Sequence, residues 1–195
     1  WDKLRRINGD NTQKVLLDRL EKSLIAKSSG TMKVFRDGFS VAGAGTITMS
    51  QRAPEDKNNP KVIAKYNENI LRVVRQLKYN PTREWEIDLV FFINGLPVAT
   101  VELKTDFTQS IDHAITQYKK DRLPVDPNSK KKEPLLTFNR GAVVHFAMSD
   151  SEIAMTTRLA GQDSFFLPFN KGKNGHAGNA ARDDGEYPVA YFWEE

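Results

Sequence analysis

The sequence predicts a mixed α/β (α+β) fold, in which a β-hairpin is followed by a helix and by further strands. Residues 85–93 and 96–104 are rich in β-branched and aromatic side chains, and they flank Asn94-Gly95, a pair typical of hairpin turns. Residues 110–122 follow with apolar side chains at helical spacing, so this helix is expected to lie on the hairpin. Two more strand-like runs toward the C-terminus would extend the sheet.

The remaining segments predict elements of several kinds. In the first part of the chain we expect an amphipathic helix within 10–30 and irregular structure with room for one strand in 31–54. A helix from 60 to 70 is followed by 71–79 as either helix or strand. Toward the C-terminus we expect the two strand-like runs 141–150 and 152–159, and then a long surface loop at 170–187 rich in Gly and Asn.

Composition limits the class of protein. Of the 195 residues, 39% are hydrophobic and 28% are charged, a balance typical of a globular chain long enough for one domain with a buried core. No apolar run reaches the roughly 18 residues of a membrane-spanning helix, and a chain without cysteine has neither disulfides nor thiolate metal ligands. The absence of an N-terminal signal segment favours an intracellular location. A net charge of +4 permits a polyanionic partner without requiring one.

Three charged residues border the predicted hairpin and form the strongest candidate site: Asp88, Glu102 and Lys104. A two-residue turn would place Asp88 and Glu102 on opposite faces of the sheet, because side chains alternate along a strand. A bulged three-residue loop, or an equivalent bulge in one strand, would place both carboxylates on one face with Lys104 beyond them. A site on this hairpin therefore requires a bulge.

If these three side chains converge, their chemistry fits the hydrolysis of a phosphodiester. Two carboxylates can hold one Mg²⁺, which keeps several of its waters, lowers the pKa of a bound water and neutralises charge on a phosphate. Lys104 lies two residues after Glu102, where it can orient the attacking water and stabilise negative charge. The alternative interpretation is that the three charges only mark the polar ends of buried strands.

Four segments in fixed order resemble the N-terminal nuclease region of the restriction (R) subunit of Type I restriction-modification enzymes, within the PD-(D/E)xK nuclease superfamily. The segments are LRVVRQLKYNP, IDLVFFINGLPVATVELKTDFTQSIDHAITQYKKDR, PLLTFNRGAVVHFAMSDSEIAMTTRLAG and FFLPFN. The resemblance implies a restriction-endonuclease-like αβββαβ core with a mixed central sheet flanked by helices. It also implies a single nuclease domain over residues 1–195, with a core at about 66–160 between an N-terminal extension and a loop-rich tail.

The same resemblance implies roles for individual residues. Asp88 takes the place of the first motif acid, and Glu102 and Lys104 take the place of the ExK pair, with Mg²⁺ held by the two carboxylates. The family often carries a Q-x-x-x-Y signature on the following helix, where this chain has Gln117 and Tyr118 as candidates for DNA handling. The spacing departs from that signature, because the motif Gln would fall on an alanine.

Two further sets of residues are weaker candidates. The family usually adds a supporting acid from an early helix, and the candidates here are Glu21 and Glu68. The lysine triplet Lys130, Lys131 and Lys132 lies in a polar, proline-bounded loop and could contact DNA phosphates, although such a run is more often simply solvated.

The implied function is a Mg²⁺-dependent endonuclease domain that hydrolyses double-stranded DNA in the cytoplasm of a prokaryote, together with methyltransferase and specificity subunits and without a membrane. Family R subunits continue into an ATP-driven DNA translocase. This chain contains no G-x-x-x-x-G-K-[ST] loop, so ATP is implied only for a motor outside it. Because the chain starts without Met and ends just after an aromatic run, we expect a fragment. The alternative is a DNA-binding or subunit-docking module whose nuclease centre is inactive in isolation.

Overall fold

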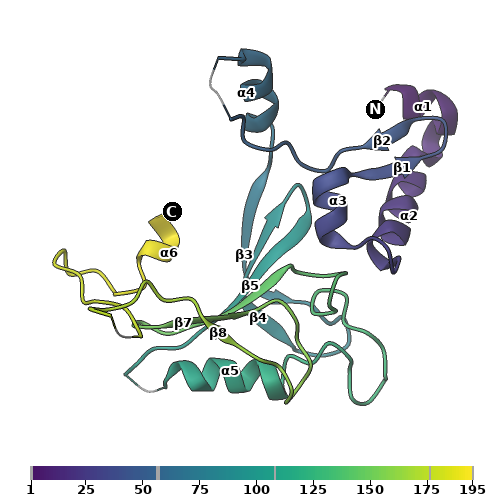
Figure 1. The fold of residues 1–195 in the computed structure, drawn as a ribbon. Coiled ribbons are helices and arrows are strands. Elements are labelled where there is room, and N and C mark those ends of the chain that lie inside the picture. Colours follow the sequence, from purple (N-terminus) through teal and green to yellow (C-terminus); the bar gives the residue numbers. More distant parts are fainter. Residues whose placement is uncertain (1, 56–57, 108, 176, 195) are drawn as a thin grey trace. The chain divides into compact units, whose positions relative to one another are not determined.

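The computed structural model describes residues 2–55, 58–107, 109–175 and 177–194, and the chain divides into two compact units (Figure 1). Unit 1 comprises the residues up to Arg72 together with Phe92–Leu96, and unit 2 comprises Val73–Phe91 and the residues from Pro97 onward. Each unit is described by itself. The single nuclease domain expected from the resemblance stays a prediction.

Unit 1 is mainly helical. Its elements are α1 (Asp2–Asn8), the short 3₁₀ helix η1 (Gly9–Asn11), α2 (Thr12–Ile25), α3 (Thr31–Asp37), β1 (Phe39–Val41), β2 (Gly45–Ile47) and α4 (Pro60–Asn67). The leucines of α2 pack against a small core whose buried members are Leu4, Val34, Phe39, Val41 and Leu96. The amphipathic helix predicted within residues 10–30 is therefore confirmed.

The expectation of irregular structure with room for one strand in residues 31–54 was wrong, because α3 and the hairpin of β1 and β2 lie there. The helix has only seven residues, too few to show a clear helical period in the sequence. Glycines mark both of its ends: Gly30 precedes it and Gly38 follows it with φ 73°. A Cβ at Gly38 would lie 2.2 Å from the backbone oxygen of Ile47, so only glycine fits this close approach.

The ambiguous segment between residues 60 and 79 forms a helix and then a strand. Helix α4 begins at Pro60, and the Asn59 side chain accepts hydrogen bonds from the backbone N–H groups of Lys61 and Val62 at its start. Strand β3 (Leu71–Lys78) follows and lies at one edge of the large sheet. Residues 71–78 therefore form a strand and not a helix, the two possibilities that the sequence pattern left open.

The large sheet has six strands in the order β3-β4-β5-β6-β7-β8. The remaining strands are β4 (Glu86–Ile93), β5 (Leu96–Leu103), β6 (Val144–Met148), β7 (Ile153–Thr156) and β8 (Leu167–Pro168). Strand β6 runs parallel to β5 and antiparallel to β7, so the sheet is mixed. Helix α5 (Ile111–Lys120) forms the crossover that a parallel pair requires. The series α4-β3-β4-β5-α5-β6 is the αβββαβ order expected from the sequence, and the fold class is confirmed.

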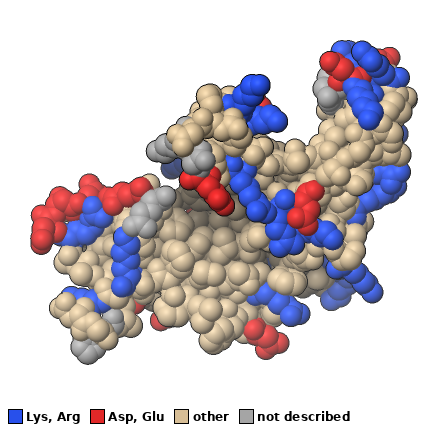
Figure 2. All heavy atoms as spheres, turned by 45° about the horizontal axis from the view of Figure 1, so that its top comes forward, with Lys and Arg blue, Asp and Glu red and all other residues tan. Residues whose placement is uncertain are grey.

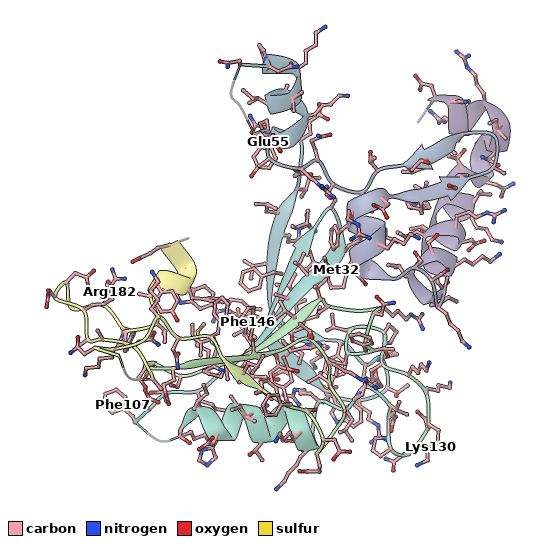
Figure 3. The ribbon with its side chains drawn as sticks, in the orientation of Figure 1. Met32, Glu55, Phe107, Lys130, Phe146 and Arg182 are labelled. Carbon is pink, nitrogen blue, oxygen red and sulfur yellow. The ribbon has the colours of Figure 1, made fainter. Side chains whose placement is uncertain are left out.

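The two faces of the sheet in unit 2 are covered by different segments (Figure 1). Thr100 and His145 are register partners on β5 and β6, and their side chains face Tyr118 of α5. The next pair, Val101 and Phe146, points to the other face, where a core cluster includes the segment leading into α6 (Tyr191–Glu194). Figure 3 shows Phe146 within the sheet. Helix α5 thus covers the face that carries the polar residues of the candidate site.

The segment 170–187 is a loop, as its composition predicts: its described residues form no helix or strand, although an isolated bridge pairs Gly172 with Asn179. Across the part of the chain that the structure describes, no helix is both long enough and apolar enough to span a membrane.

Candidate active site

The turn between β4 and β5 has two residues and lies in unit 1. Asn94 (φ 49°) and Gly95 (φ 84°) both have positive φ, as a type I′ turn requires. A hairpin that continued in regular register from such a turn would separate Asp88 and Glu102 onto opposite faces. The loop itself therefore does not supply the bulge that the site requires.

The faces of the two strands show that the register changes away from the turn. In regular register from a two-residue turn, Leu89 would lie opposite Thr100 and share its face. Instead, Leu89 and Phe91 pack against the cluster that contains Val101, on the opposite face. The pairing of β4 with β5 must therefore be irregular somewhere within the strands, which is equivalent to the bulge that the site requires.

The irregular register brings the two candidate acids together. Asp88 Oδ2 accepts a hydrogen bond of 2.8 Å from the backbone N–H of Leu103, the residue next to Glu102. The Asp88 carboxylate is also close enough to Glu102 for its negative charge to raise the pKa of that residue. The structure therefore places both carboxylates at one location in unit 2.

Glu102 is fully buried, and one of its two oxygens has no partner. Oε1 accepts a hydrogen bond of 2.5 Å from Nε of Arg122, whereas Oε2 is buried without any hydrogen bond among the described residues. Burial raises the pKa of Glu102 to about 8; the Arg122 charge opposes this shift, and the Asp88 charge adds to it. Without a metal, Glu102 therefore keeps its proton at neutral pH, and a cation bound beside it would favour the ionised carboxylate.

Lys104 lies one residue past the end of β5 and remains on the sheet. Its backbone N–H donates to the carbonyl oxygen of Met148 at 2.9 Å, which continues the pairing with β6 for one more residue. Two positions after Glu102, Lys104 is therefore directed to the same side of the strand. Its side chain is half-buried and forms no ion pair with any described residue, so its ammonium group is available to a ligand.

The donor set of Asp88 and Glu102 fits Mg²⁺. This ion usually binds through one or two carboxylates and keeps several waters, so it does not need a cage of protein ligands. The described residues contain no group of three or more His, Cys, Asp or Glu side chains that could hold a metal, so an ion here would depend on these two carboxylates and its own waters. The unpartnered Oε2 of Glu102 is the atom that most clearly lacks a positive partner.

Arg122 belongs to this site, although it was not among the residues predicted from the sequence. The residue follows α5, and its backbone N–H donates to the carbonyl oxygen of Gln117 at 3.1 Å, which keeps it on the last turn of the helix. A signal was present in the sequence: Ala114, Tyr118 and Arg122 are spaced four apart and share the buried face of α5. Burial lowers the pKa of Arg122, but the Glu102 carboxylate raises it above its ordinary value.

Tyr118 lies in the core beside the site, and Gln117 next to it is half-buried. The Tyr118 hydroxyl is 2.8 Å from Oγ1 of Thr100, which is itself 2.7 Å from Nδ1 of His145. The Tyr118 ring also packs against Phe166, with 5.7 Å between ring centroids. Since the hydroxyl is used inside the protein, its geometry favours a packing role, and DNA handling by Gln117 or Tyr118 stays a prediction.

The buried His145 gives a testable pH dependence. Its side chain is 1% exposed, and burial lowers its pKa to about 3, so the folded protein holds the ring neutral. The unfolded chain binds this proton near pH 6.5. The stability contributed by the neutral ring is therefore complete above pH 6.5 and is lost as the pH falls toward 3, at up to about 1.4 kcal/mol per pH unit. We expect urea midpoints of the wild type to fall more steeply across this range than those of His145→Gln; equal slopes would contradict the assignment.

The two candidates for the supporting acid lie in unit 1. Glu21 is exposed on α2, and Glu68 is exposed at the C-cap of α4. Asp88, Glu102 and Lys104 all belong to unit 2. A supporting role for either glutamate stays a prediction.

The lysine triplet lies on an exposed loop that one buried aspartate organises. Asp126 accepts hydrogen bonds from the backbone N–H of Asn128 at 2.8 Å, from the Ser129 hydroxyl at 2.9 Å and from Nε of Arg83 at 3.3 Å. The backbone hydrogen bond from Asn128 is the main reason that the pKa of Asp126 is lowered. Lys130, Lys131 and Lys132 are exposed on this loop, where Figure 3 shows Lys130. A contact with DNA phosphates stays a prediction.

Charge alone does not mark a binding surface. Both Lys or Arg and Asp or Glu side chains lie on the face shown in Figure 2, as the modest net charge of +4 implies. A nucleic-acid interface on this protein must therefore be argued from particular residues rather than from the sign of the surface.

The comparison with known protein families identifies the family of this chain. A family model described as Type I restriction enzyme R protein N terminus matches residues 2–164, which include Asp88, Glu102, Lys104, Arg122 and the whole αβββαβ series. No curated protein and no solved structure matches the chain. This match confirms the resemblance to the N-terminal region of Type I R subunits, and it covers more than four-fifths of the chain. The chain belongs to the family of Type I restriction enzyme R protein N termini.

Proposed function

We propose that this chain is a Mg²⁺-dependent endonuclease domain of the PD-(D/E)xK type that hydrolyses phosphodiesters of double-stranded DNA within a Type I restriction enzyme. One observation carries the proposal. The carboxylates of Asp88 and Glu102 lie together although the turn between their strands would separate them, and a buried oxygen of Glu102 receives no hydrogen bond from any residue that the structure describes. Charges that only marked the polar ends of strands would not place the fully buried Glu102 beside a second carboxylate, because that arrangement is costly without a cation.

The residues have distinct roles in this proposal. Asp88 and Glu102 would hold the metal, with the free Oε2 of Glu102 as the most available ligand atom. Mg²⁺ bound there would supply a more acidic water and neutralise charge on the phosphate. Lys104 would orient the attacking water by a hydrogen bond and stabilise negative charge on the phosphoryl oxygens. Tyr118 and Thr100 would hold α5 against the strand that carries Glu102.

The proposed partners follow from the family. Double-stranded DNA is the proposed substrate, and methyltransferase and specificity subunits are the proposed partners, reached through the complete R subunit. ATP would serve only a motor region outside this chain. Lys130, Lys131 and Lys132 are the proposed contacts with DNA phosphates, because they are exposed on one loop of the unit that carries the site.

The proposal is tested by titrating Mn²⁺, as a stand-in for Mg²⁺, into the wild-type chain and into Glu102→Ala by calorimetry. We expect binding in the wild type and none in the variant, because the variant lacks the ligand with the free oxygen. Glu133→Ala is the matched control: Glu133 is also a buried glutamate of unit 2, but its partner is Asn80. Equal Mn²⁺ binding by the wild type and Glu102→Ala would overturn the proposed site.

Nicking of supercoiled plasmid in the presence of Mg²⁺ separates the proposed function from its alternative. Metal-dependent nicking that disappears in Glu102→Ala would support a nuclease. Mn²⁺ binding without any nicking would favour the alternative, a DNA-binding or subunit-docking module whose nuclease centre is inactive in isolation.

A further inference from the structure

Arg122 forms a hydrogen bond with only one of the two carboxylate oxygens of Glu102. Nε of Arg122 donates to Oε1 of Glu102 at 2.5 Å, and Oε2 of the same carboxylate has no hydrogen bond within the described part of the chain. An arginine that only neutralised a buried glutamate would gain most from a two-pronged contact with both oxygens. Arg122 thus fixes Oε1, whereas Oε2 receives no hydrogen bond from a donor among the described residues and lies in the carboxylate that interacts with Asp88.

Both partners are buried deeply enough to make this arrangement unusual. Glu102 is 0% exposed and Arg122 is 9% exposed. A buried ion pair does not by itself stabilise a fold more than apolar side chains of similar size. The pair is therefore better explained by an effect on the carboxylate than by its contribution to folding.

The structure fixes Arg122 before any ligand binds. Gln117, one turn earlier on α5, accepts hydrogen bonds from the backbone N–H groups of both Asp121 and Arg122. Tyr118 anchors the same turn in the core through Thr100, a strand neighbour of Glu102 on β5. Arg122 thus reaches Glu102 from the turn that directly follows α5, where the hydrogen bond to Gln117 holds its backbone.

We propose that Arg122 is a positioning residue, which holds Oε1 of Glu102 so that Oε2 is presented to the metal next to Asp88. The inference rests on the proposed function and deepens it, because it assigns the orientation of the metal ligand Glu102 to the residue Arg122, just after α5. Partners that orient a ligating carboxylate are typically worth about 10–100-fold in metal affinity. Arg122 would not touch the substrate or the metal.

The experiment compares Mn²⁺ binding by the wild-type chain, Arg122→Met and Arg122→Lys in calorimetry. We expect the Kd of Arg122→Met to rise about 10–100-fold. Arg122→Lys should recover part of that loss, since an ammonium group still donates to the carboxylate but without the rigid plane of the guanidinium. In nicking assays the Mg²⁺ concentration at half-maximal rate should rise in the same order, while the KM for DNA stays unchanged.

Arg83→Met is the matched control for loss of a partly buried arginine. Arg83 lies in the same unit and pairs with Asp126 at 3.3 Å, at the base of the lysine loop. Its replacement should leave the Kd for Mn²⁺ unchanged. A rise in Kd equal to that of Arg122→Met would show a general loss of structure and would overturn the positioning role.

Two negative outcomes have different meanings. Mn²⁺ binding of wild-type strength in folded Arg122→Met would overturn the role of Arg122 and leave the proposed function intact. An absence of Mn²⁺ binding in the wild type would overturn both. Near-UV circular dichroism reports whether each variant folds; if Arg122→Met does not, Arg122→Lys decides, and an unchanged Kd there overturns the inference.

Discussion

Replacing Lys104 with alanine should lower the rate of DNA cleavage about 10²–10⁴-fold, the usual contribution of a positioned acid or base. The Kd for Mn²⁺ should stay unchanged, because the ammonium group is not a metal ligand. The structure supports this separation: Lys104 is directed to the side of β5 that carries Glu102, and it forms no ion pair with a described residue. Plasmid nicking gives the rate, and calorimetry gives the metal affinity.

Lys120→Ala is the control for a general loss of positive charge. Lys120 is an exposed lysine in the last turn of α5, in the same unit as Lys104. We expect it to change cleavage by no more than a few-fold. If both alanine variants lost cleavage equally, Lys104 would act through DNA binding rather than at the reacting phosphate. If Lys104→Ala abolished Mn²⁺ binding as well, its role would be structural.

Replacing Tyr118 with alanine should lower the free energy of unfolding by about 3–5 kcal/mol, as expected when a large buried aromatic side chain is truncated. Tyr118 is 0% exposed, and its ring packs against His145 and Phe166 at centroid distances of 5.8 and 5.7 Å. The variant leaves a cavity between α5 and the sheet and removes a partner of Thr100. Urea denaturation followed by tryptophan fluorescence measures the loss.

Two further variants separate packing from a role in DNA handling. Tyr118→Phe keeps the ring and should cost only about 1 kcal/mol, because it removes one hydrogen bond while Thr100 keeps its contact with His145. Tyr187→Ala is the exposed control: Tyr187 is 57% exposed, and its loss should change stability by less than about 0.5 kcal/mol. A large loss of DNA affinity in stable Tyr118→Phe would instead support a direct role of the hydroxyl with DNA.

The hairpin and the crossover helix were predictable because their signals are local. Alternating β-branched and aromatic residues around Asn94-Gly95 gave two strands, and the apolar spacing of residues 111–118 gave α5. Helix α3 was not predictable in this way. It has seven residues, and the close approach of Gly38 to Ile47 that ends it exists only after β1 and β2 have paired.

The candidate acids were predictable as residue types but not as a site. The sequence alone determined that two carboxylates and a lysine lie at the ends of two adjoining strands, in an order that resembles the R subunit family. It also determined that a bulge was needed to bring them together. It did not determine whether that bulge existed, since a two-residue turn and an irregular strand are both compatible with the same residues.

Only the tertiary structure decided the surroundings of Glu102. The register of β4 against β5 depends on which side chains pack on each face of the sheet, and that choice is made by α5 and by the C-terminal segment. The pairing with Arg122, the free Oε2 and the raised pKa of Glu102 all follow from burial between these elements. Residue types and local periods are written in the sequence, whereas electrostatics depend on distance and exclusion of water, which long-range packing alone fixes.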